Sequence, residues 1–313
     1  MDKIIAIEPY KQKIAYKEWL PYDRLNTLEQ GTIICSHGLG DSAGAFDVMA
    51  PVLATKGFRV IAIDLPGHGL SCHTGRYSQH HIAESLLGFV IQLELFETEE
   101  DVFLVSHSYS AEAAPFLVGT YPKLFKKIVQ LDNPGPPKDP LINPFTGESY
   151  ANHATRLRKF YDKGLVKPTR QPPKYESIEQ AAQNRARSAI SFFKISEQAA
   201  YNIARRSYKR IDEQHYIPTL DPLFMKDTWP FGAGHICPRK DIEAIVENVS
   251  AQCLLIKFDS WKEEWWIKMQ KPLLKHYPSL KCEYVKGPHH AFAIDESGII
   301  CGNIVAEFFT RET

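Results

Sequence analysis

A serine flanked by small residues follows an apolar run at residues 102–110, which read Val-Phe-Leu-Val-Ser-His-Ser-Tyr-Ser. This pattern is typical of a sharp turn between a strand and a helix that presents the central serine, Ser108, as a nucleophile. Glycine is common at the two flanking positions, where strand and helix nearly touch, and here Ser106 and Ser110 replace it. The alternative interpretation is an ordinary strand end with a helix cap.

A serine hydroxyl needs an adjacent base before it attacks a carbonyl carbon at neutral pH. The candidate base is His289, which follows a predicted strand end in the segment Gly287-Pro288-His289-His290. The Gly-X-His spacing favours His289 over His290, and the side chains of adjacent residues rarely share a direction. We therefore expect His289 to take the proton of Ser108 during the attack.

A charged imidazole needs a buried carboxylate to orient and stabilise it, and the sequence offers two candidates. Asp132 ends one predicted strand, where it could instead cap the turn that Asn133 opens. Asp259 ends another, where it could instead cap a helix that begins near Trp261, with Glu263 at a capping-box-like position. The sequence does not decide between the two carboxylates.

A second turn could stabilise the negative oxygen that forms during acyl transfer. Residues 32–42 read Thr-Ile-Ile-Cys-Ser-His-Gly-Leu-Gly-Asp-Ser, a short buried strand that runs into a His-Gly turn. The backbone N–H groups of Leu39 and Tyr109 are the expected oxyanion donors. We expect His37 to hold this loop by hydrogen bonds. In the turn at 64–71 we expect Asp64 and His68 to brace loops rather than react.

Together these segments resemble the α/β-hydrolase superfamily, in its serine hydrolase-like branch. The likeness spans roughly residues 13–309 and rests on His37-Gly38, the 64–71 turn, the Ser108 turn, Leu254-Leu255-Ile256-Lys257 and Gly287-Pro288-His289. It implies an α/β fold with a mostly parallel twisted sheet flanked by helices, a helical cap and a Ser-His-acid hydrolase. In most members the acid follows the seventh strand in a Gly-X-X-Asp turn, and in some it follows the sixth. This chain reads Ile256-Lys257-Phe258-Asp259-Ser260-Trp261 at the former turn, which has no glycine and is shortened, so that Asp259 stands at the strand end itself.

Composition supports an ordinary globular protein. Apolar residues make up 44% of the 313 residues, charged residues 24%, and the formal net charge is zero, so nothing suggests nucleic acid as a partner. The six cysteines lie apart without a Cys-X-X-Cys pair, and no motif predicts a metal or a cofactor. No apolar run approaches 18 residues, and the N-terminus does not read as a signal peptide, so we expect no membrane span and a cytoplasmic location.

Strand patterns alternate with helical patterns along most of the chain, which predicts a mostly parallel sheet covered on both faces. Strands are predicted near 12–18, 31–36, 58–64, 102–107, 127–132, 253–258 and 281–286, and helices near 43–55, 79–95, 109–120, 261–277 and 299–310.

The alternation breaks at the proline-rich segment 133–140. From about 135 to 240 only helical segments are predicted, around 152–163, 176–187, 189–208 and 239–248. We therefore predict a body formed by residues 1–134 and 241–313, with a helical cap at 135–240 inserted before the seventh strand.

The predicted cap carries an uneven charge. Residues 151–235 contain 15 Lys and Arg against 8 Asp and Glu, a balance of +7. These charges are either solvated helix faces or an electropositive roof that attracts an anionic substrate. The cap aromatics are either cap core or substrate lining: Phe192, Phe193, Tyr201, Trp229 and Phe231.

The leading hypothesis is an esterase-like hydrolase that cleaves a small carboxylic ester, amide or thioester through an acyl-serine. One alternative is a lyase or acyltransferase on the same scaffold. Another is a non-catalytic, ligand-binding protein, which the serine-substituted turn and the shortened acid turn would favour. The expected partner is a small-molecule acyl substrate, either neutral or anionic; the sequence predicts neither its identity nor an oligomeric state.

Overall fold

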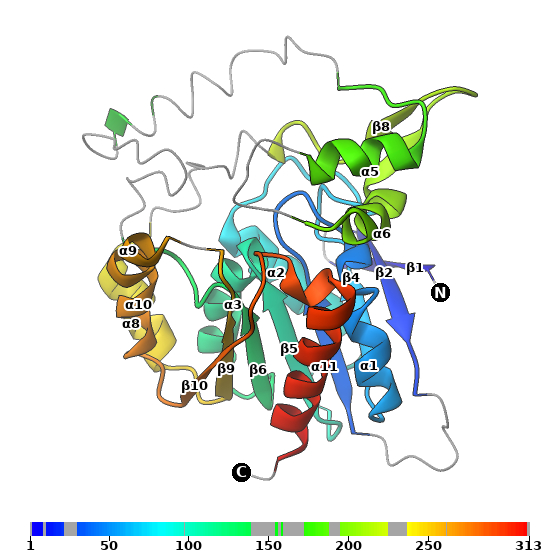
Figure 1. The fold of residues 1–313 in the computed structure, drawn as a ribbon. Helices are drawn as coiled ribbons and strands as arrows, with labels where there is room; N and C mark the ends of the chain where they lie inside the picture. The colour runs from blue at the N-terminus through cyan, green and yellow to red at the C-terminus, as the bar shows by residue number, and fades with distance from the viewer. Residues whose placement is uncertain are drawn as a thin grey trace.

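An eight-stranded sheet forms the centre of the molecule (Figure 1). The computed structural model describes residues 2–8, 11–21, 30–96, 98–138, 154–155, 158, 172–187, 195–224, 237–260 and 262–311. In chain order the strands are β1 (Asp2–Ile7), β2 (Gln12–Trp19), β3 (Thr32–Ser36), β4 (Arg59–Ile63), β5 (Val102–His107), β6 (Lys127–Leu131), β9 (Gln252–Lys257) and β10 (Leu280–Tyr284). Their spatial order is β1-β2-β4-β3-β5-β6-β9-β10. Only β1–β2 and β2–β4 pair antiparallel; the other pairs are parallel.

Helices cover both faces of the sheet, as the alternating sequence pattern predicted. Helices α1 (Met49–Thr55) and α11 (Asp295–Thr310) pack on one face, and α2 (Gln79–Gln92), α3 (Tyr109–Thr120) and α8 (Arg239–Glu247) on the other. Neighbouring strand residues point to opposite faces: Ile33 joins one hydrophobic core and Ile34 the other. Strands buried on both faces read as continuous apolar runs, which is why they are visible in the sequence.

Several element boundaries differ from the prediction. Strand β1 was not expected. The helix predicted at 261–277 is broken into α9 (Glu263–Trp265), a π-helical turn (Trp266–Gln270) and α10 (Lys271–Leu274), whose first turn contains a proline. A proline lacks the N–H that a continuous α-helix would need there. Within the described ranges no helix combines the length and apolar character required to cross a bilayer.

The region predicted as an all-helical cap also contains a small sheet. Helices α5 (Ile178–Ala186) and α6 (Glu197–Ser207) are followed by the antiparallel strands β7 (Tyr208–Arg210) and β8 (Tyr216–Pro218). The prediction of helices alone was therefore wrong, because three-residue strands are too short to show a period. The helix predicted at 152–163 lies mostly outside the described residues. Four of the cap aromatics lie outside them entirely: Phe192, Phe193, Trp229 and Phe231. The cap boundaries stay a prediction.

Helix α6 rests directly on the body. It packs against the 3₁₀ turn Ala43–Phe46, where a Cβ on Gly44 would lie 2.3 Å from the carbonyl oxygen of Asn202. Any larger residue at Gly44 would therefore push α6 away. Figure 1 shows α5 and α6 together beyond one end of the central sheet.

Candidate active site

The turn between β5 and α3 holds Ser108 in an uncommon backbone conformation. Its φ is 52° and its ψ −111°, a region that costs a non-glycine residue about 1–3 kcal/mol. Residues 102–107 and 109–111 are buried, whereas Ser108 is partly exposed. The strained turn thus lifts one serine out of an otherwise buried segment, as the sequence pattern predicted.

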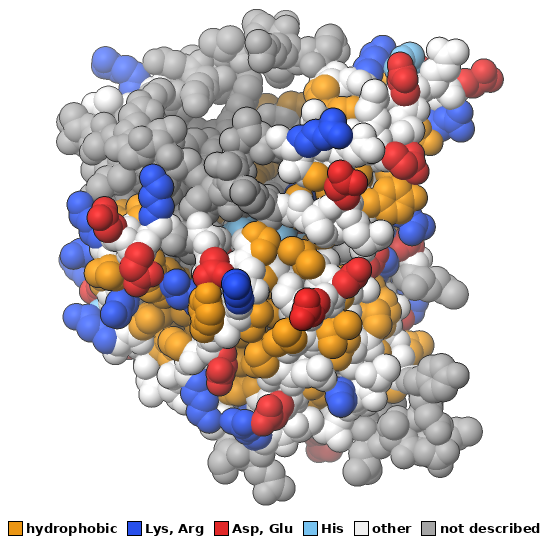
Figure 2. All heavy atoms as spheres, viewed as in Figure 1, with side chains coloured by type: hydrophobic (Ala, Val, Ile, Leu, Met, Phe, Trp, Pro, Cys, Tyr) orange, Lys and Arg blue, Asp and Glu red, His pale blue; other side chains and the backbone are white. Residues whose placement is uncertain are grey.

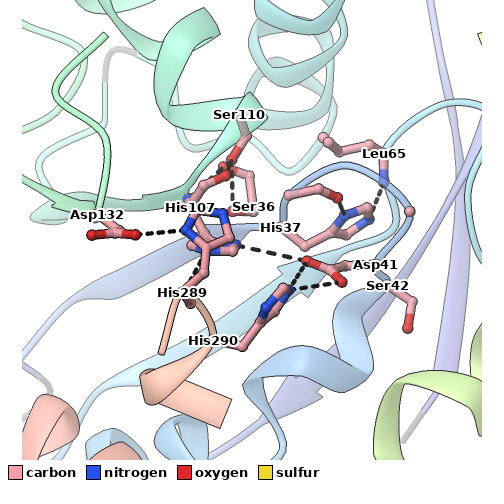
Figure 3. A network of polar contacts seen from close by, with 12 residues as sticks. Ser36, His37, Asp41, Ser42, Leu65, His107, Ser110, Asp132, His289 and His290 are labelled. Atoms are coloured by element: carbon pink, nitrogen blue, oxygen red, sulfur yellow. Dashed lines mark hydrogen bonds and ion pairs between the residues drawn. The ribbon is translucent and has the colours of Figure 1, made fainter. Parts of the chain in front are cut away.

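The flanking serines do more than replace glycine. The Oγ atom of Ser110 accepts a hydrogen bond from the His107 N–H at 3.1 Å, and it lies 2.7 Å from the Ser36 carbonyl oxygen, to which it donates. Ser110 therefore ties the start of α3 to the ends of β3 and β5 (Figure 3). Ser106 is fully buried in β5, next to Ser36 in the sheet register.

Asp132 and His289 form a buried pair at the same edge of the sheet. His289 Nδ1 donates to Asp132 Oδ2 at 2.6 Å, and neither side chain is more than 1% exposed. Asp132 follows β6 with a φ of 63°, and its other oxygen accepts the Phe258 N–H at 2.9 Å. The Ser260 hydroxyl donates to Oδ2 as well. Burial lowers the pKa of His289, and the hydrogen bond to Asp132 opposes that shift in part, so the imidazole is neutral near pH 7.

Asp259, the other candidate acid, lies elsewhere. It is exposed, and its oxygens accept the Gly287 N–H at 3.1 Å and the Tyr284 hydroxyl. It therefore pins the start of the 287–290 loop instead of facing the His289 ring. The carboxylate that contacts His289 in the structure is Asp132. The alternative expectation, that Asp259 contacts His289, is therefore wrong. The supporting Ser260 was not predicted; its signal is its place three residues after the end of β9, the strand that pairs with β6.

The His-Gly turn lies against the nucleophile turn. A Cβ on Gly38 would lie 3.1 Å from Ser108 Cβ and 2.9 Å from His107 Nδ1, so only glycine lets the two turns approach. Within the described ranges the Leu39 N–H has no hydrogen-bond acceptor. Tyr109, the other expected oxyanion donor, is the first residue of α3. Leu39 follows Gly38 and Tyr109 follows Ser108, so the two amides belong to the two turns that meet here.

The bracing residues lie where the sequence predicted. His37 Nε2 accepts the Leu65 N–H at 3.0 Å, which leaves Nδ1–H to donate to the Gly38 carbonyl at 2.8 Å. Asp64 Oδ1 accepts the Ala43 N–H at 2.8 Å. His68 Nε2 accepts the Gly40 N–H at 3.0 Å.

A buried cluster that the sequence analysis did not single out connects the turns. Asp41 lies between His290, whose Nε2 is 3.1 Å from Oδ2, and His107, whose Nδ1 is 3.7 Å from the same oxygen (Figure 3). Arg185 of α5 donates to the Gly40 carbonyl at 2.7 Å and to Asp41 Oδ1. Burial alone would raise the pKa of Asp41, but the neighbouring His290 and the Arg185 guanidinium hold it well below its usual range.

Two basic cap residues bind carboxylates of the body. Arg185 pairs with Asp41, and Arg206 of α6, only 5% exposed, pairs with Asp64 at 2.6 Å and with Asp2. In the view of Figure 2, Lys and Arg side chains are interspersed with Asp and Glu side chains over the described surface and do not form one basic patch. These two arginines therefore do not contribute free charge to an electropositive roof.

Glu112 lies one helical turn after Ser108. Its carboxyl accepts from the side-chain amides of Gln79 at 3.0 Å and Asn133 at 3.1 Å. Burial raises the pKa of Glu112 to about 8, against the effect of the two amides. A protonated carboxyl therefore persists beside the nucleophile turn at neutral pH.

Comparison with known proteins places the chain in a family. The family model for the α/β-hydrolase fold matches residues 31–214, more than half of the chain, and the chain belongs to that family. A serine hydrolase-like protein from Dictyostelium discoideum is 32% identical over 119 residues, which are 38% of this chain and 32% of that protein. Serine hydrolase-like protein 2 from Homo sapiens is 21% identical over 93% of this chain and 92% of its own length. The crystal structure of a hypothetical protein from Pseudomonas aeruginosa PAO1 is similar in fold, with a TM-score of 0.78, 23% identity and 99% coverage of both chains.

Proposed function

We propose that this α/β hydrolase is a serine hydrolase that cleaves a small carboxylic ester, amide or thioester through an acyl-serine intermediate. The observation that carries the proposal is the buried His289–Asp132 hydrogen bond of 2.6 Å at the sheet edge where Ser108 emerges. A nucleophile, a base and an acid that orients the base are the three parts this chemistry needs.

Each group has one role in the proposed reaction. Ser108 Oγ attacks the carbonyl carbon while His289 Nε2 takes its proton, and Asp132 holds Nδ1–H and stabilises the charged ring. The N–H groups of Leu39 and Tyr109 bind the negative oxygen. The tetrahedral intermediate expels the alcohol, amine or thiol, which receives the proton from His289. Water, deprotonated by His289, then cleaves the acyl-serine.

The proposal requires Ser108 and His289 to meet. Within the described residues Ser108 Oγ makes no hydrogen bond, so its bond to His289 Nε2 must form in the substrate complex, where such contacts tighten. The names of the relatives from Dictyostelium and human support a serine hydrolase-like chemistry without naming a substrate. Because Arg185 and Arg206 are paired with carboxylates of the body, we propose the reaction class without a preference for anionic substrates.

Covalent labelling tests the nucleophile and product analysis tests the reaction. A fluorophosphonate probe should label the wild-type protein at Ser108 and fail to label Ser108→Ala, with Ser106→Ala as the matched control that keeps labelling. Hydrolysis of p-nitrophenyl esters of graded chain length should fall by several orders of magnitude in Ser108→Ala and in His289→Ala, and little further in the double variant.

Three results would contradict the proposal. Labelling that persists in Ser108→Ala would move the nucleophile to another residue. An acyl group recovered on an acceptor other than water would indicate an acyltransferase. Neither labelling nor turnover of any ester would indicate a non-catalytic protein.

A further inference from the structure

The Asp41 cluster gathers three metal-binding side chains beside the proposed active site. One donor atom each from Asp41, His107 and His290 lies within 4.8 Å of the other two. Asp41 Oδ2 is 3.1 Å from His290 Nε2 and 3.7 Å from His107 Nδ1. None of the three side chains is more than 6% exposed. Asp41 lies in the loop after β3, His107 ends β5 and His290 lies in the loop after β10, so the fold itself assembles the cluster.

The hydrogen bonds of His107 fix which of its nitrogens carries the proton. Nε2 lies 2.9 Å from the carbonyl oxygen of His289, which can only accept, so the proton is on Nε2. In a neutral ring Nδ1 then has a lone pair, and it faces Asp41 Oδ2 without any hydrogen-bond partner. Two electron-rich atoms thus face each other in a buried place, an arrangement that a cation between them would stabilise.

We propose that Asp41 Oδ2, His107 Nδ1 and His290 Nε2 bind a divalent transition-metal ion, with Zn²⁺ as the representative. Zn²⁺ takes imidazole nitrogens and carboxylate oxygens at about 2.0–2.2 Å, which separates tetrahedral ligand atoms by roughly 3.3 Å. The separations of 3.1 and 3.7 Å here lie on either side of that value. Two imidazoles exclude Mg²⁺ and Ca²⁺ as the preferred ions, since those ions favour oxygen ligands.

The surroundings match those of a metal-binding histidine. Such a ligand commonly donates its other ring N–H to a backbone carbonyl, as His107 Nε2 does to His289. Arg185 donates to Asp41 Oδ1, and Oδ2 is the carboxylate oxygen that faces both imidazoles, although His290 Nε2 also lies 3.2 Å from Oδ1. On binding, the metal replaces the proton on His290 Nε2, and the ring takes a proton on Nδ1, so it stays neutral.

One of the three proposed ligands borders a cavity. Asp41 and Arg185 line a cavity of about 180 Å³ together with Gly40 and with Tyr208 and Pro218 of β7 and β8. This cavity is the side of the cluster that faces α5 and the β7–β8 pair.

The site would also affect the proposed chemistry. His107 precedes Ser108 and His290 follows His289 in the chain. One bound ion would therefore hold the backbone next to each of the two proposed reacting residues. This consequence rests on the proposed function, whereas metal binding itself does not. Binding is therefore measured without substrate, and its outcome is independent of whether the protein hydrolyses esters.

Calorimetric titration of the full chain with ZnCl₂, after treatment with a chelator, tests the site. We expect one saturable site per chain in the wild type and an affinity lower by roughly tenfold or more in His290→Gln and in Asp41→Asn. The matched control is His276→Gln, because His276 is a histidine outside the cluster that also lies beside carboxylates, Glu247 at 2.7 Å and Glu243 at 3.3 Å. This variant should keep wild-type affinity.

Several outcomes would overturn the proposal: no saturable uptake by the wild type, equal affinity in His290→Gln, or loss of binding in His276→Gln alone. If the cluster variants fail to fold, Co²⁺ added to the wild type decides. Visible absorption typical of a four- or five-coordinate ion with nitrogen ligands supports the site, and its absence means that a proton on His107 Nδ1 completes the cluster instead.

Discussion

The Ser260 hydroxyl donates to the same oxygen of Asp132, Oδ2, that binds Nδ1 of His289. Asp132 Oδ1 in turn accepts the Phe258 N–H at 2.9 Å. The two residues that hold the Asp132 carboxylate, Phe258 and Ser260, thus lie in the shortened turn that follows β9. Asp132 itself follows β6 and contacts His289.

Asparagine at the two candidate acids should give opposite results. In Asp132→Asn the His289 ring loses the carboxylate that sets its tautomer, and kcat/KM for an activated ester should fall by at least a few hundredfold, toward the ~10⁴-fold known for serine proteases. Asp259→Asn removes only an exposed acceptor for Gly287 and Tyr284 and should keep activity within a few fold. Near-normal activity in Asp132→Asn would show that Asp132 does not orient His289.

Removing the Ser260 hydroxyl should produce a smaller effect of the same kind. A hydrogen bond to a charged group contributes about 1.5–3 kcal/mol, and Asp132 keeps its Phe258 contact in Ser260→Ala. We expect kcat to fall by roughly tenfold with KM unchanged. The control is Ser250→Ala, because the Ser250 hydroxyl donates to the distant Pro122 carbonyl oxygen. A change confined to KM would mean that Ser260 acts on substrate binding.

The turn at Ser110 should tolerate neither loss of its hydroxyl nor a large side chain. Ser110→Ala removes the bonds to Ser36 and His107 and should lower the free energy of unfolding by about 1–3 kcal/mol in urea denaturation. Ser110→Leu should cost more, because the buried turn has no room for it. Equal stability of all three proteins would show that strand and helix are not closely packed here.

The two arginines of α6 should differ sharply. Arg206→Met leaves the buried Asp64 carboxylate without its cation, and breaking such a pair costs about 3–5 kcal/mol. Arg205, which lies over the Tyr201 ring at the surface, provides the control Arg205→Met, expected within about 0.5 kcal/mol of wild type. Chemical denaturation of both variants compares them; equal losses would mean that the Arg206–Asp64 pair does not anchor α6.

Glu112 should make the protein less stable as pH rises. Its pKa is about 8 in the folded protein against 4.5 in the unfolded chain, so between these values only the folded state keeps the proton. Stability from this group is full below pH 4.5 and is lost progressively up to about pH 8. Glu112→Gln should flatten that part of the profile of Tm against pH, whereas Glu84→Gln, at an exposed position of α2, should not. An unchanged profile in Glu112→Gln would show that Glu112 is ionised when folded.

The sequence predicted those parts of the site that a short segment of the chain determines by itself. The Ser108 turn and the Gly-X-His segment are short patterns, and their residues lie where those patterns indicated. The choice between Asp132 and Asp259 depends on how β6 pairs with β9, which no local pattern encodes. The Asp41 cluster requires the end of β5 and two loops from distant parts of the chain to meet, so composition and spacing could not reveal it.

The pairing of β6 with β9 also bears on how the protein folds. β6 ends at Leu131 and β9 begins at Gln252, so the whole cap region lies in the loop that this pairing closes. Contacts between residues so far apart in sequence form slowly, although the entropy of closing a longer loop grows only logarithmically. The β1–β6 part of the sheet can thus pair before Ser260 reaches Asp132. Recovery of activity during refolding should therefore lag behind recovery of secondary structure.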